Sequence, residues 1–160
     1  MSKLANLKYK ILVVDDVDLN TTFALLLEFD GHEVRTVYTA EAALAMLEKL
    51  KFDLMITEYW LPRMKGDELA ALVKQEWPDQ PIIIATANIE EINTDDHPIT
   101  GVDCLLNKPF SMSQLREAIN LVLEGCAGSQ QGGLGTHGVH VFTSRNRPTR
   151  ETHQDRQRQR

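Results

Sequence analysis

KILVVDD, residues Lys10 to Asp16, is an apolar run that ends abruptly in two aspartates. A second apolar run, Leu54 to Thr57, follows about forty residues later and ends on Glu58. In open parallel sheets, ligands bind outside the carboxyl ends of the strands. We therefore expect Asp15, Asp16 and Glu58 to lie near one another at a single edge of a parallel sheet.

Carboxylates in such a position suit a small, hard cation. Mg²⁺ binds through one or two carboxylates, keeps several waters and usually shares its site with a phosphate group. The sequence thus predicts a magnesium pocket formed by Asp15, Asp16 and Glu58. The alternative interpretation is a solvated acidic turn after a strand, which would be favoured if the two aspartates stood alone.

Apolar runs alternate with helical periodicities five times along the chain. This pattern is typical of an α/β fold, here a doubly wound, five-stranded parallel sheet with crossover helices on both faces. The expected strands are Tyr9 to Val14, Glu33 to Tyr38, Asp53 to Thr57, Pro81 to Thr86 and Asp103 to Asn107. The first expected helix has Leu19, Phe23, Leu26 and Leu27 on one face and ends at Gly31. The other expected helices are Ala40 to Leu50, Asp67 to Trp77, Asn88 to His97, and Ser111 to Leu123.

Helix boundaries carry local signals of different strength. Thr39 is the expected N-cap of the second helix, and Ser111 with Gln114 forms a capping box before the fifth. The fourth helix has only Ile89 and Ile92 as apolar anchors. We expect it to be marginally stable and therefore a candidate for movement, because switching elements come from the least stable parts of a structure.

The composition changes after Glu124, so we divide the chain into a domain at 1–124 and a tail at 125–160. The tail is rich in Gly, Gln, Thr and Arg without a sustained apolar period, and we expect it to be disordered. It holds six arginines against two acids, a net charge of +4, so that the overall −6 leaves −10 on the domain. An acidic domain argues against contact with nucleic acid, which would have to use the tail.

Four motifs in register resemble the receiver domain of bacterial response regulators, over residues 8 to about 124. They are IlvvDD at Ile11 to Asp16, FDLmiteywLPrMkGdEL at Phe52 to Leu69, PIIiaTA at Pro81 to Ala87 and GvdcLlnKPF at Gly101 to Phe110. The resemblance implies a stand-alone signalling module of a two-component phosphorelay. It also implies partners such as a sensor histidine kinase or another signalling protein, and a homodimer through the face of the fourth helix, fifth strand and fifth helix.

The resemblance assigns roles to individual positions. Asp15 and Asp16 would hold Mg²⁺, together with the third acid and the backbone carbonyl of Trp60. Thr86 and Lys108 would contact the phosphoryl group, with a cis peptide bond before Pro109.

Two positions depart from the family pattern. Glu58 stands where the family has its phosphoacceptor aspartate, and Leu105 stands where the family has a switch aromatic. The extra methylene moves the carboxylate of Glu58 outward by about 1.5 Å, and a displacement of about 1 Å can lower a rate on the order of a hundredfold.

We therefore expect a degenerate receiver that acts without phosphorylation and in which Glu58 reaches Lys108 or Thr86 as a partial mimic of the phosphorylated state, with weakened Mg²⁺ binding. The alternative is an active receiver that still accepts a phosphoryl group from a histidine kinase with Mg²⁺.

Other function classes lack their sequence signals. No glycine-rich phosphate loop follows any expected strand, and the acids after the first strand would repel the phosphate of a flavin. We expect no enzyme activity. The sequence has no apolar run long enough to span a bilayer and no signal peptide at its start, which predicts a cytoplasmic protein without membrane contact.

Overall fold

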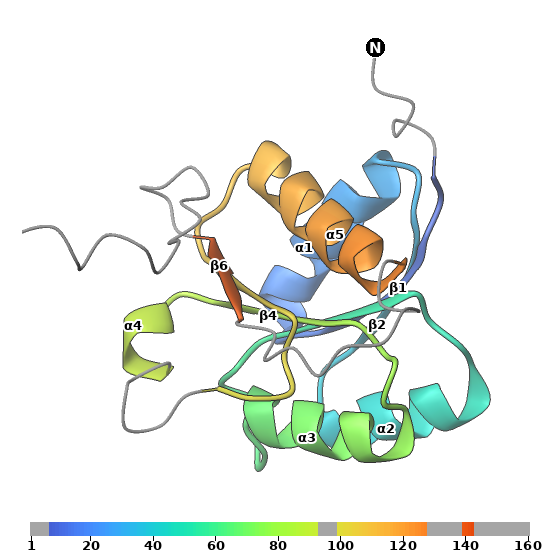
Figure 1. Cartoon of the computed structure of the whole chain (residues 1–160), viewed down its shortest axis with the longest axis vertical. Coiled ribbons are helices and arrows are strands. Elements are labelled where there is room, and N and C mark those ends of the chain that lie inside the picture. The colour runs from blue at the N-terminus through green and yellow to red at the C-terminus, as the bar shows by residue number, and fades with distance from the viewer. Residues whose placement is uncertain (1–6, 93–98, 128–138, 143–160) are drawn as a thin grey trace, which may run out of the picture.

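The computed structural model describes residues 7–92, 99–127 and 139–142, in which helices cover both faces of a parallel sheet (Figure 1). The strands follow the order β2-β1-β3-β4-β5-β6, and every neighbouring pair is parallel. They are β1 (Lys10–Val14), β2 (Glu33–Val37), β3 (Leu54–Thr57), β4 (Ile82–Thr86), β5 (Cys104–Asn107) and β6 (His140–Phe142). The helices are α1 (Val17–Phe29), α2 (Ala40–Lys49), α3 (Gly66–Glu76), α4 (Ile89–Ile92) and α5 (Met112–Ala127).

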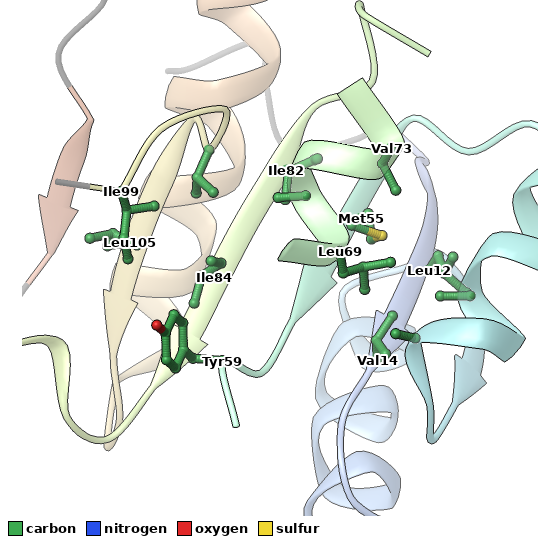
Figure 2. Packing of buried hydrophobic residues seen from close by; sticks show 14 of the residues in the cluster. Leu12, Val14, Met55, Tyr59, Leu69, Val73, Ile82, Ile84, Ile99 and Leu105 are labelled. Carbon is green, nitrogen blue, oxygen red and sulfur yellow. The ribbon is translucent and has the colours of Figure 1, made fainter. Parts of the chain in front are cut away.

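The sheet separates two apolar clusters because successive side chains of a strand point to opposite faces. Ile11 and Val13 of β1 pack in the cluster that includes α1 and α5, whereas Leu12 and Val14 pack in the cluster under α2 and α3. Figure 2 shows the second cluster, in which Leu12 and Val14 lie on the same side of the sheet as residues of α3. Burial on both faces explains why the strands are continuous apolar runs in the sequence.

The local boundary signals are confirmed. The Thr39 side chain accepts a hydrogen bond from the Ala42 N–H at 3.2 Å. The backbone N–H of Ser111 donates to the Gln114 side chain at 2.8 Å, and the backbone N–H of Gln114 donates to the Ser111 hydroxyl at 3.2 Å. Gly31 follows α1 with φ of +91°, a conformation that favours glycine. The described part of the fourth helix is Ile89–Ile92, and residues 93–97 of the expected helix lie outside the described residues.

The expectation of five strands was wrong, because β6 adds a sixth strand from the segment expected to be disordered. Helix α5 also continues to Ala127, three residues beyond the expected domain boundary at Glu124. Strand β6 forms because Phe142 packs into the cluster beside α5, a contact that no local period reveals. Residues 128–138 and 143–160 of the expected disordered tail lie outside the described residues. Within the part of the chain that is described, no helix is long and apolar enough to cross a bilayer.

Folding should become less favourable in mild acid because of His32, which joins α1 to β2. Its Nδ1 accepts a hydrogen bond from the Tyr9 N–H at 3.3 Å, which requires an unprotonated nitrogen. Burial lowers the pKa of His32, although Asp30 acts in the opposite direction. The unfolded chain therefore takes up this proton more readily. The contribution of neutral His32 to the free energy of unfolding is complete above its unfolded pKa of about 6.5. It is lost as the pH falls below that value.

Urea unfolding at pH 7.5 and 5.5 measures this effect. His32→Asn keeps an acceptor at the position of Nδ1 but has no titration, so it should lose less stability between the two pH values than the wild type. Equal losses in the two proteins would contradict the assignment.

Candidate functional site

Three charged side chains meet at the carboxyl end of the sheet. Asp15 follows β1, Glu58 follows β3 and Lys108 follows β5. The Lys108 Nζ lies 2.6 Å from Asp15 Oδ2 and 3.0 Å from Glu58 Oε2. The side chains of Lys108, Asp15 and Glu58 are only 16%, 6% and 15% exposed, respectively. One ammonium group thus bridges two carboxylates in a site that is largely shielded from solvent.

Backbone hydrogen bonds fix these residues just beyond their strands. The N–H groups of Asp15, Glu58 and Lys108 donate to Val37, Val14 and Thr86 carbonyls, at 3.2, 2.8 and 2.8 Å. Each bond continues the ladder of the sheet by one residue. The separation of the three charged groups is therefore set by the strand spacing rather than by a flexible loop.

Both carboxylate oxygens of Glu58 have partners. Oε2 contacts Lys108, and Oε1 accepts a hydrogen bond from the Tyr59 N–H at 2.7 Å and a longer one from the Trp60 N–H at 3.4 Å. The side chain is consequently folded back on its own loop and is held at both oxygens. Charge-assisted bonds of this kind are stronger than those between neutral groups.

Burial and charge shift the pKa values of Asp15 and Lys108. Burial raises the pKa of the Asp15 carboxyl above its ordinary value, although Lys108 opposes this effect. For Lys108, burial acts to lower the pKa, but the hydrogen bonds and charges of Asp15 and Glu58 outweigh it and raise the pKa. The lysine is therefore cationic at neutral pH, and its charge keeps two neighbouring carboxylates together.

Two residues that the sequence analysis did not select shape the loop after β3. A Cβ on Gly66 would lie 2.5 Å from the Glu58 carbonyl oxygen, and the Gly66 N–H donates to the Tyr59 carbonyl at 2.7 Å. Only glycine permits this close approach. Tyr59 turns into the core, and Figure 2 shows its ring close to Ile84 of β4. The glycine of the MKGDEL segment was the available sequence signal for the close approach.

The other predicted site residues occupy different surroundings. Thr86 is the last residue of β4 and therefore lies at the carboxyl end of the sheet, where it is 1% exposed. Asp16 is exposed, and its N–H donates to Asp15 Oδ1 at 2.8 Å. The Trp60 indole is largely exposed and packs edge-on against Tyr59, with ring centroids 4.9 Å apart. The metal-binding role of the Trp60 carbonyl stays a prediction. The peptide bond between Lys108 and Pro109 is cis.

The oxygen atoms of Asp15, Asp16 and Glu58 are the kind of ligand that Mg²⁺ accepts. A cage of three side chains is not preformed, because the described residues contain no group of three or more His, Cys, Asp or Glu arranged to hold a metal. The ammonium of Lys108 instead lies against two of the three carboxylates. The donor set therefore fits a partly hydrated Mg²⁺ held by one or two carboxylates.

Comparisons with known proteins identify the family of the chain. The sequence model of the response regulator receiver domain matches residues 11–120. The sensor histidine kinase AruS of Pseudomonas aeruginosa is 36% identical over 118 residues, which are 71% of this chain and 12% of that protein. The alkaline phosphatase synthesis transcriptional regulatory protein PhoP of Bacillus subtilis is 33% identical over 115 residues, 71% of this chain and 48% of that one. The chain thus spans less than half the length of each of these relatives.

Solved structures show the same fold. The response regulator protein TrrA of Thermotoga maritima, crystallised with Mg²⁺ and BeF, is 28% identical and superposes with a TM-score of 0.66, over 73% of this chain and all of that one. The residues matched by the family model, 11–120, include Asp15, Glu58 and Lys108. The chain therefore belongs to the family of response regulator receiver domains, the modules of two-component signalling systems.

Proposed function

We propose that this receiver domain is a degenerate signalling module that acts without phosphorylation, because Glu58 replaces the phosphoacceptor aspartate. The observation that carries the proposal is the direct contact between Glu58 Oε2 and Lys108 Nζ at 3.0 Å. The cation that would otherwise meet a phosphoryl group is already bound to a side chain of the protein.

The surroundings of Glu58 also disfavour its use as a nucleophile. Attack on a phosphodonor needs a carboxylate oxygen aligned with the phosphorus and its leaving group. One oxygen of Glu58 is bound by Lys108 and the other by the Tyr59 N–H. A reaction would have to break one of these bonds as well as tolerate the longer side chain. Glu58 therefore serves better as a fixed partial substitute for a phosphorylated aspartate, with one charge instead of nearly two.

Such a module acts through protein–protein interaction and catalyses no reaction of its own. Its proposed partners are a sensor histidine kinase or another signalling protein of the cytoplasm, and a second copy bound through the face of α4, β5 and α5. Similarity to a sensor histidine kinase and to a transcriptional regulatory protein supports a partner from two-component signalling. Mg²⁺ is its proposed, weakly bound cofactor, and when bound it would neutralise charge on Asp15 and its neighbours.

The second candidate function is an active receiver that accepts a phosphoryl group with Mg²⁺. The observation in its favour is that TrrA, which superposes over 73% of this chain, was crystallised with Mg²⁺ and BeF. The two candidates differ in one measurable property, which is the reactivity of the residue at position 58.

Incubation with acetyl phosphate and Mg²⁺, followed by intact-protein mass spectrometry, tests this reactivity. The wild type should gain no phosphoryl group, whereas Glu58→Asp should gain one because the shorter carboxylate restores the alignment. We expect the rate for the wild type to be lower by roughly a hundredfold or more. Glu58→Gln is the control without a nucleophile. A phosphoryl group mapped to Glu58 in the wild type would overturn the proposal in favour of the active receiver.

Removal of the bridging cation should destabilise the fold. Lys108→Met removes the ammonium that contacts both Asp15 and Glu58 while their carboxylates stay close together, and the loss should be on the order of 3 kcal/mol at pH 7. Glu58→Gln in the Lys108→Met background should recover part of this loss, which gives a coupling energy of about 1–2 kcal/mol in a double-mutant cycle. Urea unfolding measures all four proteins.

Lys51→Met, at an exposed position, is the matched control and should change stability by less than about 0.5 kcal/mol. Additive effects of the two site substitutions would show that the bridge between Lys108 and Glu58 contributes nothing.

Magnesium binding can be followed through the indole of Trp60, which lies two residues from Glu58 and is largely exposed. Addition of Mg²⁺ should change the fluorescence of the wild type, and Trp60→Phe should remove this change. Asp15→Asn should abolish binding, whereas Asp79→Asn, at an exposed acid three residues after α3, should leave it unchanged. A wild type that shows no response to Mg²⁺ would exclude the cofactor.

A further inference from the structure

The edge of the sheet next to β5 is covered by the chain's own C-terminal segment. Strand β6 pairs in parallel with β5, with His140, Val141 and Phe142 opposite Cys104, Leu105 and Leu106. Figure 1 shows β6 as the outermost strand on the side of the sheet where α4 lies. The connection from α5 to β6 is residues 128–138, so β6 is tethered to the edge that it covers.

A single aromatic side chain anchors β6. Phe142 is 6% exposed and belongs to the cluster that contains Leu106 of β5 and Leu115 and Ile119 of α5. Val139, just before the strand, packs partly against the cluster on the other face of the sheet. His140 is exposed, and Val141 is 44% exposed. The strand thus combines backbone pairing with one deep apolar contact.

An edge with these properties can exchange its occupant. Edge strands present backbone groups that pair with any suitable extended segment, and such pairing supplies affinity while side-chain pockets supply specificity. A tethered strand competes with a free one through its high effective concentration. Because β6 has three residues and one buried anchor, its advantage over a free segment comes mainly from the tether.

We propose that the β5 edge is a strand-binding site for an extended protein segment, and that β6 closes this site in cis as an autoinhibitory strand. The partner segment pairs in parallel with β5 and places an aromatic or other bulky apolar side chain where Phe142 lies. The site opens when β6 leaves it. This inference goes beyond the proposed function of Glu58 and holds whether or not that residue accepts phosphate.

The first test uses the full chain with Phe142→Asp, which removes the anchor. Hydrogen–deuterium exchange of the β5 amides that pair with β6 should become at least tenfold faster, because the hydrogen bonds to β6 open. His140→Asp, which puts the same carboxylate at an exposed position of the same strand, should change this exchange by less than threefold. Phe142→Ala is a milder variant that should act in the same direction. Unchanged exchange in both Phe142 variants would overturn the proposal.

The second test adds a fluorescent peptide of residues 136–145, THGVHVFTSR, to the full chain and measures anisotropy. The Phe142→Asp chain should bind it at least tenfold more tightly than the wild type, in which β6 competes in cis. The same peptide with aspartate in place of its phenylalanine should lose this binding. Equal affinity for the two chains, or no binding to the Phe142→Asp chain, would overturn the proposal. Self-association of that chain without peptide binding would assign the edge to a second copy and also overturn it.

Discussion

The site depends on one buried charge arrangement, in which the ammonium of Lys108 lies between the carboxylates of Asp15 and Glu58. Two carboxylates so far from solvent would repel each other without it, and charges in a partly buried site are weakly screened. Asp15 and Lys108 are 93 residues apart in the sequence, and the parallel strand order β1-β3-β4-β5 brings them and Glu58 to one edge of the sheet. The apolar core thus serves the site by fixing the strands that end there.

Most of the sheet could be predicted because β1, β3, β4 and β5 are short apolar runs with almost fully buried side chains. Strand β6 could not, since its residues lie in a segment poor in apolar side chains and their stability comes from distant contacts. Burial of a phenylalanine contributes about 1.5–3 kcal/mol, while each ordered residue costs about 1–2 kcal/mol of backbone entropy. Whether Phe142 reaches a cluster beside α5 is a property of the tertiary structure alone.

The site also has a part that could be predicted from the sequence and a part that could not. The approach of Asp15, Glu58 and Lys108 could be predicted, because each residue directly follows a strand of a parallel sheet. Asp16 does not share the surroundings of Asp15, because it is exposed whereas Asp15 is buried. Adjacent side chains of an extended backbone point in opposite directions. The close passage of Gly66 beside the Glu58 carbonyl depends on how the loop after β3 folds back, which the sequence indicates only by the glycine itself.

Strand β5 belongs to both the charged site and the sheet edge. Its last residue, Asn107, immediately precedes Lys108, and Leu106 lies opposite Phe142 of β6. Four residues of extended backbone are a stiff connection between the cation at one end and the strand along its side. A ligand at the charged site that changes the affinity of the edge for β6 therefore has its own affinity changed by the same factor when the occupant of the edge changes. This follows because linkage between two binding events is symmetric. A segment bound at this edge would thereby report on the charge state of a pocket that it never touches.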